Sequence, residues 1–311
     1  NSGERIKIDW QGNIALSDGE RLVLGAEPAR DAMQVPVSAG YDTDAGYAEL
    51  QSDLGGSFFN TLALRYDSNS RFGDKLTWRI APAYLIAATG TKFKASIGTG
   101  FKAPSLEDLY QSFPAFFFFA NPNLKPETST GYDIGIEQAL ANGRVRTGVT
   151  YFHNDIKNLI GDNATFTMDI NIGRARTQGV ESFVSWQVTD ALNLRGDYTY
   201  TEAYDTVLRQ HLSRRPKTKA SLNASWQAMT ALSLNATLLY VGPMIDSSRD
   251  FSVPRLTTGG YTTVNLESDY DVSDTVTMFG RVSNLLGRTY ENPTGFLAPG
   301  RAFYAGVKAK L

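Results

Sequence analysis

In Thr61-Leu62-Ala63-Leu64-Arg65-Tyr66 every second side chain is large and apolar, which places Leu62, Leu64 and Tyr66 on one face. The other face carries Thr61 and Arg65. A period of two residues is the signature of a β-strand whose two faces meet different surroundings. The same split recurs in residues 145–151, 192–200 and 232–240, and no period near 3.6 competes with it. The sequence therefore predicts an all-β fold.

Strand length and connection length extend this prediction. The alternating segments number about fifteen and run for roughly 10–15 residues, which suits strands tilted across a membrane. Short turns are predicted on one side at residues 88–90, 141–143, 189–190, 229–230 and 272–274. Longer connections are predicted on the other side near 28–42, 68–74, 102–128, 158–172, 203–216, 243–259 and 288–300. This alternation is the layout of outer-membrane barrels, so we expect a transmembrane antiparallel β-barrel.

Composition excludes several classes of function. The 311 residues contain no cysteine, which leaves no disulfide, thiol nucleophile or thiolate metal site. The formal net charge of -2 provides no basic field of the kind that nucleic-acid binding requires. No apolar run reaches the roughly 18 residues of a transmembrane helix, so a spanning structure would have to be a closed barrel.

The two faces of the predicted strands suggest which one meets lipid. Tyrosines on the apolar face fit the headgroup level of a membrane; these are Tyr66, Tyr151, Tyr198, Tyr200 and Tyr240. Charged residues on the opposite face would be costly in hydrocarbon and are expected to line a wet or plugged lumen. The candidates are Arg146, Arg174, Arg176, Arg195, Glu267 and Arg281.

The longest interruption of the strand pattern runs from Phe101 to Glu127 and reads FKAPSLEDLYQSFPAFFFFANPNLKPE. Loops of this length are usually functional or disordered. Two interpretations stay open: an aromatic loop that contacts ligand, or a loop that folds inward and packs on its neighbours. The candidate ligand-binding residues here are Tyr110, Phe113, Phe116, Phe117, Phe118, Phe119 and Asn121. Arg214 and Arg215, in a neighbouring long loop, are candidates for contact with ligand or with lipopolysaccharide phosphates.

An enzymatic role is not expected. Neither His153 nor His211 lies beside a recognisable nucleophile motif, and the sequence predicts no catalytic residue, metal site or cofactor. A passive porin is the alternative from another class, with the aromatic loop serving as its constriction.

Six motifs occur in order along the chain: RFGDK (71–75) with WRIAP (78–82), GFKAPS (100–105), NPNLKPE (121–127), GRARTQGVE (173–181), RRPK (214–217) and NLLGRTY (284–290). Together they resemble the TonB-dependent outer-membrane transporters, particularly the branch that includes the vitamin B12 receptor. The resemblance implies a barrel of about 22 strands with a plugged lumen. Residues 1–311 would then be the C-terminal portion, with about fifteen strands, and the plug and the first strands are expected to be absent.

The resemblance also implies a function and partners. We expect active uptake of a bulky, scarce nutrient across a Gram-negative outer membrane, with cobalamin first and a ferric siderophore as the alternative. Haem is less favoured, because no histidine lies between Pro104 and Asn121. The implied partners are the TonB–ExbB–ExbD complex through a plug, outer-membrane lipid and lipopolysaccharide, the barrel-assembly machinery and a small-molecule ligand, with the protein acting as a monomer. Leu311 stands where the last strand of the family usually ends in an aromatic residue.

Overall fold

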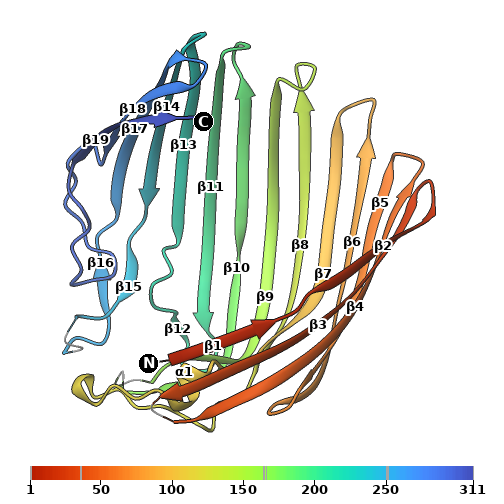
Figure 1. The fold of residues 1–311 in the computed structure, drawn as a ribbon, viewed down its shortest axis with the longest axis vertical. Helices are drawn as coiled ribbons and strands as arrows, with labels where there is room; N and C mark the ends of the chain where they lie inside the picture. Colours follow the sequence, from red (N-terminus) through yellow and green to blue (C-terminus); the bar gives the residue numbers. More distant parts are fainter. Residues whose placement is uncertain (1, 36, 164, 166, 250–251, 311) are drawn as a thin grey trace.

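The computed structural model describes residues 2–35, 37–163, 165, 167–249 and 252–310. Leu311, the residue on which barrel-assembly recognition was considered, lies outside the described residues. The described chain forms one antiparallel sheet of 17 strands with a separate two-stranded ribbon (Figure 1). No helix in these residues is long and apolar enough to cross a membrane.

The strands follow one another along the sheet in chain order, and each pairs antiparallel with its neighbours in the sheet. They are β1 (Ser2–Lys7), β2 (Trp10–Ser17), β3 (Glu20–Val35), β4 (Ala39–Leu54), β5 (Phe58–Asn69), β6 (Gly73–Ile86), β7 (Thr91–Lys102), β8 (Glu127–Leu140), β9 (Val145–Asp162), β10 (Asp169–Gln187), β11 (Leu192–Asp205), β12 (Gln210–His211), β13 (Thr218–Met229), β14 (Leu232–Val241), β17 (Tyr261–Ser273), β18 (Val276–Ser283) and β19 (Ala302–Ala309). The ribbon is β15 (Met244–Asp246) with β16 (Leu256–Thr258). The helical elements are α1 (Leu106–Tyr110) and the short 3-10 helix η1 (Pro114–Phe116).

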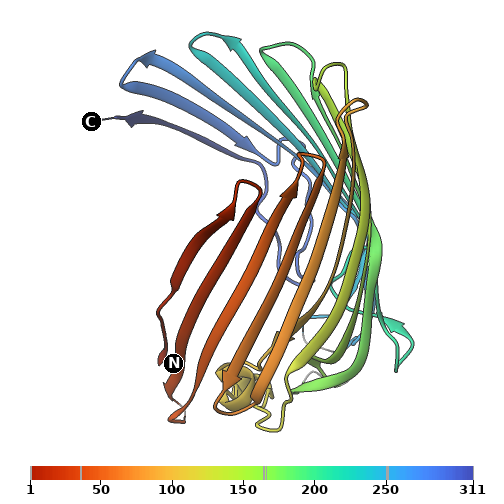
Figure 2. The ribbon, with the colours of Figure 1, turned by 90° about the vertical axis from the view of Figure 1, so that its right-hand side faces the viewer.

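These strands fill fifteen positions in the sheet. Strands β1 and β2 both pair with β3 and share one edge position, and β12 only extends the ladder beside β11. The expectation of about fifteen strands is confirmed for the described residues. Fifteen antiparallel positions make the two edges, β1/β2 and β19, run in the same direction, and no pairing between described residues joins them. Figure 2 shows these edges apart, with the sheet curved as a barrel wall.

Short turns gather at one end of the sheet and long loops at the other, as Figure 1 shows at the top and bottom. We call these the short-turn end and the long-loop end. The long connections are the β7–β8 loop (103–126), the β11–β13 loop (206–217), the β14–β17 loop (242–260) and the β18–β19 loop (284–301). The predicted alternation of short turns at one end and longer connections at the other is confirmed.

Three predicted long connections were wrong, because strands occupy most of them. In the predicted connection 158–172, strands β9 and β10 occupy 158–162 and 169–172. Strands β3 and β4 continue through most of 28–42, and only residues 70–72 separate β5 from β6. Proline is tolerated at position 28 because its missing N–H would face the neighbouring edge, where β1 ends and β2 has not yet begun. The Pro28 carbonyl still accepts a hydrogen bond of 3.0 Å from the Ile8 N–H.

The outer face of the sheet carries an exposed apolar band that includes Leu62, Leu64, Val184 and Trp186. Such a band is expected where strands face lipid. The predicted girdle tyrosines Tyr66, Tyr151, Tyr198 and Tyr240 are exposed on this face, and the register places Tyr200 with them. The inner face instead carries ion pairs, including Lys94 with Glu137 at 2.7 Å.

The expected lumen position of Arg174 and Arg176 was wrong. The register of β10 against β9 runs without a shift from Trp186 to Arg174, so both arginines share the outer face with Trp186. They lie at the long-loop end of the strand, past the apolar band. At that level a charge no longer marks the inner face, because the outer face is polar too.

Candidate functional site

The β7–β8 loop begins with a helix that its own sequence caps. The Ser105 hydroxyl accepts a hydrogen bond from the Asp108 N–H at 3.1 Å, and the Asp108 carboxylate accepts one from the Ser105 N–H at 3.0 Å. This reciprocal capping box satisfies two N–H groups at the start of α1. The helix turns Leu106 and Leu109 toward the protein, and Leu109 is 0% exposed.

The loop folds inward and packs on the inner wall of the sheet. Leu106, Leu109 and Leu124 of the loop form a buried cluster with Met33. The register places Met33 on the inner face of β3. Partly buried Tyr41, Phe72, Tyr110 and Ile160 surround this cluster. The principal hydrophobic core of the described chain therefore lies inside the long-loop end.

Arg71, in the first of the six motifs, clamps the loop from the neighbouring β5–β6 connection. Its guanidinium donates to the Tyr110 hydroxyl and, at 2.9 Å, to the carbonyl of Pro122. It also lies 5.4 Å from the ring centre of Phe72 and 5.3 Å from that of Tyr110. Tyr110, predicted to contact ligand, is thus engaged in holding the loop.

The far side of the loop docks on the connection between β9 and β10 and on the start of β10. The Phe119 N–H donates to the Thr167 carbonyl at 2.7 Å, and the side-chain amide of Asn121 donates to the Asp169 carbonyl at 2.9 Å. The Lys125 N–H donates to the side chain of Asn171 at 2.8 Å. Asn121, another predicted ligand contact, therefore anchors the loop.

The tip between these anchors presents aromatic rings. Phe113 and Phe118 exchange two backbone hydrogen bonds, of 2.7 and 3.2 Å, and so close a small ring of chain. Phe117 adopts the left-handed conformation with φ of 54°, and its side chain is 73% exposed. Phe119 is 46% exposed, whereas Phe113 and Phe118 are partly buried. The side chain of Phe116 lies outside the described part of the structure. Each of the two interpretations of this loop fits a different part of it: the anchors pack inward and the tip is open.

Acidic side chains gather beneath the docked loop, beyond the girdle of tyrosines. Asp162 and Asp169 face each other at the ends of β9 and β10. Burial, together with the charges of Asp162, Asp108 and Glu107, raises the pKa of Asp169 to about 6, and Lys102 opposes this change. Burial also raises the pKa of Asp162, against the charge of Arg214. No three acidic or histidine side chains among the described residues are arranged to hold a metal ion.

This group makes docking of the β7–β8 loop depend on pH. The ordinary pKa of Asp169 is near 3.8, and its pKa in the docked state is about 6. Because the docked state favours the protonated carboxyl, docking becomes less stable as pH rises through this range. Amide hydrogen exchange in residues 103–126, corrected for its intrinsic pH dependence, should therefore be faster at pH 7 than at pH 4. In Asp169→Asn most of that difference should disappear, while the exposed control Asp190→Asn should retain it. An unchanged pH response in Asp169→Asn would contradict the assignment.

A buried carboxylate joins the other three long loops. Asp246 is 1% exposed and accepts hydrogen bonds from Arg214 Nε at 2.8 Å, the Ser247 N–H at 2.9 Å and the Thr294 N–H at 2.8 Å. Burial alone would raise the pKa of Asp246, but these hydrogen bonds lower it, so the group stays ionised at neutral pH. Arg214, predicted to meet ligand or lipopolysaccharide, instead ties the β11–β13 loop to this junction. The exposed Arg215 donates to the Arg214 carbonyl at 3.1 Å.

The last motif, NLLGRTY, builds the start of the β18–β19 loop. Asn284 is buried with φ of 50°, and its side chain donates to the carbonyl of Arg288 at 2.8 Å and accepts from the N–H of Arg288 at 2.9 Å. Gly287 has φ of 62°, a conformation that glycine adopts without strain. Tyr290 stacks on Tyr261 with ring centres 3.9 Å apart. This motif holds the loop in place.

The remaining predicted lumen residues lie on the inner face by register: Arg146, Arg195, Glu267 and Arg281. Arg195 pairs with Asp197 at 2.7 Å, and Arg281 approaches Glu267 at 3.5 Å. Both histidines lie on the outer face, where His153 stacks on Tyr132 at 4.9 Å and His211 contacts Tyr204 at 5.4 Å.

Sequence reasoning missed three acidic residues at the long-loop end, Asp162, Asp169 and Asp246. Each lies in or beside a long loop, where aspartate is also common for turn chemistry, so nothing local singled them out. Arg71 stood in a quoted motif, and only the fold shows that it reaches Tyr110.

Comparison with known proteins first identifies a family and a relative. The family model described as "TonB dependent receptor-like, beta-barrel" matches residues 9–285. The vitamin B12 transporter of Photobacterium profundum is 29% identical over 325 residues, covering 99% of this chain and 50% of that protein.

Two solved structures from Pseudomonas aeruginosa share the fold. A variant of the ferric enterobactin receptor in complex with enterobactin superposes with a TM-score of 0.84 at 21% identity, covering 99% of this chain and 54% of that one. The siderophore receptor PirA superposes with a TM-score of 0.77 at 23% identity, covering 99% and 55%. The chain thus spans about half the length of the relatives it matches.

Proposed function

Because this chain belongs to the family of TonB-dependent receptor-like β-barrels, we propose that it forms the wall and the ligand-capturing mouth of an active transporter. Proteins of this family lie in the bacterial outer membrane and are transporters or receptors, not enzymes. The long-loop end is then the extracellular mouth of the barrel, and the short turns face the periplasm.

One observation carries the proposal: the β7–β8 loop is anchored on both flanks inside the mouth and leaves Phe117 and Phe119 open at its tip. A rigid support for exposed rings suits capture of a large ligand, because little side-chain freedom is lost when the ligand covers them. Flat apolar area of this kind fits a bulky ring system better than it fits a small ion.

We infer that the ligand is a cobalamin. The 29% identity with a vitamin B12 transporter extends over 99% of this chain, which supports this choice. A ferric siderophore is the alternative, since exposed phenyl rings offer the same contact to aromatic chelating groups. Haem is disfavoured further, because both histidines lie on the outer face of the wall and not on the face that lines the lumen.

Transport itself would need parts that lie outside this chain. In the proposal, TonB acts on a plug held within the lumen, and the inner-face charges contact that plug. Modest polar contacts of this kind exchange readily with water, which would let a plug move against the wall. The porin alternative requires neither TonB nor a plug.

Calorimetric titration of the full-length protein in detergent tests the ligand assignment. Calorimetry is preferable to tryptophan fluorescence because Trp10, Trp78, Trp186 and Trp226 are all exposed on the outer face, away from the mouth. We expect saturable binding of cyanocobalamin. Binding of a ferric triscatecholate without cyanocobalamin binding would assign the siderophore alternative. Binding of neither, together with steady conductance in planar bilayers, would identify a passive pore.

A further inference from the structure

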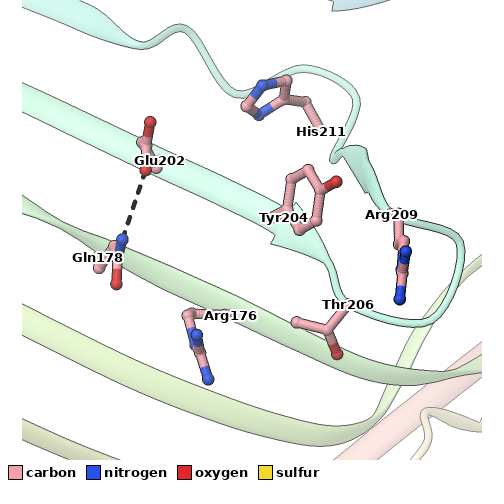
Figure 3. A pocket seen from close by; sticks show the side chains of 7 residues that line it. All are labelled: Arg176, Gln178, Glu202, Tyr204, Thr206, Arg209 and His211. Atoms are coloured by element: carbon pink, nitrogen blue, oxygen red, sulfur yellow. Dashed lines mark hydrogen bonds between the residues drawn. The ribbon is translucent and has the colours of Figure 1, made fainter.

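A cavity lies outside the mouth, on the outer face of the wall. It has a volume of about 570 Å³ and is lined by Arg176 and Gln178 of β10, Glu202 and Tyr204 of β11, and Arg209 and His211 beyond them (Figure 3). Gln178 donates to Glu202 at 3.4 Å across the floor. These strand residues alternate with inner-face residues such as Ala175 and Ala203, both buried, so the cavity opens away from the lumen.

The height of this cavity matches the membrane surface. Arg176 and Trp186 share the outer face of β10 and are ten residues apart. At about 3.3 Å per residue this is roughly 33 Å along the strand, or about 25 Å across a membrane for a strand tilted by about 40°. That distance equals the height of the apolar band of such barrels. Tyr151 and Tyr200 lie just below the cavity, at the level where aromatic girdles occur. The cavity therefore opens among the headgroups of the outer leaflet.

Further basic side chains lie beside the cavity. Lys157 and Arg174 are directly opposite each other in the ladder between β9 and β10, and both are exposed on the outer face. Like charges in this position destabilise a sheet unless an anion lies between them. Among the described residues neither forms an ion pair with a carboxylate, and the same holds for Arg209, whereas Arg176 pairs with Asp155 at 3.0 Å. We call Lys157, Arg174 and Arg209 the outer-face basic cluster.

We propose that the outer-face basic cluster binds the phosphate groups of a phosphorylated glycolipid in the outer leaflet, the headgroup class of lipopolysaccharide. Arginine matches phosphate through paired N–H donors, and cations near a membrane surface add attraction to anionic headgroups. The acyl chains of the same lipid would lie along the half of the apolar band nearest the cavity, where Ile134 and Val149 are exposed. This site is separate from the mouth and does not depend on which nutrient the protein takes up.

Native mass spectrometry of the full-length protein with bis-phosphorylated lipid A tests the proposal. The double variant Lys157→Gln/Arg174→Gln should bind this lipid about thirtyfold more weakly than the unmodified protein. The charge-matched control Arg21→Gln/Lys310→Gln removes two exposed cations at the short-turn end and should bind as the unmodified protein does. Lipid A without phosphates should bind weakly to all three proteins.

Two results would overturn the proposal: equal loss in the double variant and its control, or displacement of lipid A by millimolar inorganic phosphate, which would indicate a site for free phosphate. Folding of each variant is checked by its heat-dependent mobility in detergent gels. Arg209→Gln, which changes a loop and no strand, should weaken lipid binding severalfold, and it provides the test if the double variant does not fold.

Discussion

Asp246→Ala is expected to release three long loops at once. The substitution removes the common acceptor for Arg214, Ser247 and Thr294 and leaves the arginine without its partner. Breaking a buried ion pair from one side costs about 3–5 kcal/mol, and because Arg214 is half-exposed we expect the lower figure of about 2–3 kcal/mol. Amide hydrogen exchange in residues 284–301 should accelerate by roughly 30- to 100-fold.

The control for this result is a surface ion pair in a short turn. Asp190→Ala breaks the contact of 3.0 Å between Asp190 and Arg144, whose side chains are 89% and 53% exposed. Such pairs contribute less than about 1 kcal/mol, so exchange near the turn should change less than fivefold. If both variants changed exchange to the same small extent, Asp246 would not be the junction of the loops.

The double variant Phe117→Ser/Phe119→Ser is expected to abolish most ligand affinity while the loop stays docked. Both rings are exposed in the free protein, so their loss removes contact area from the bound ligand and little from the fold. Partial burial of two phenyl rings against a ligand contributes about 3 kcal/mol to the binding free energy. Loss of this contribution should raise Kd about a hundredfold. Calorimetry with the ligand identified for the unmodified protein measures the change.

Val207→Ser/Leu208→Ser is the matched control, because these residues form an equally exposed apolar pair, 61% and 64% exposed, in a different loop. Its affinity for the ligand should be unchanged. Hydrogen exchange at Leu109 should also be unchanged in the phenylalanine variant, which separates loss of contact from loss of docking. An affinity within threefold of the unmodified protein would show that the ligand does not reach the tip.

Strand identity could be predicted from the sequence because alternation is a local property. The pattern around Leu62 and Leu64 is repeated wherever one face of a strand meets lipid, and it indicated the fold class, the strand number and the order of turns and loops. Strand ends could not be predicted as well. Residues 28–35 and 39–42 contain proline and polar side chains but remain paired, because the break between β1 and β2 accommodates Pro28.

The site was predictable only in part, because it is made by contacts between distant segments. The sequence identified the aromatic loop but could not show that Tyr110 and Asn121 anchor it while Phe117 and Phe119 stay open. Arg214 was chosen for its charge, and its partner Asp246 is 32 residues away. Arg176 was assigned to the wrong face, since a charge at a strand end has the same appearance on either side of the wall.

The closed tip of the β7–β8 loop has a consequence for how binding preference can diverge among related chains. Residues 113–118 form a miniature hairpin held by its own backbone, and the flanking segments are fixed by side chains outside it. Substitutions within this hairpin leave those attachments intact. Substitutions in residues 113–118 can therefore change which ligand the tip contacts without destabilising the barrel.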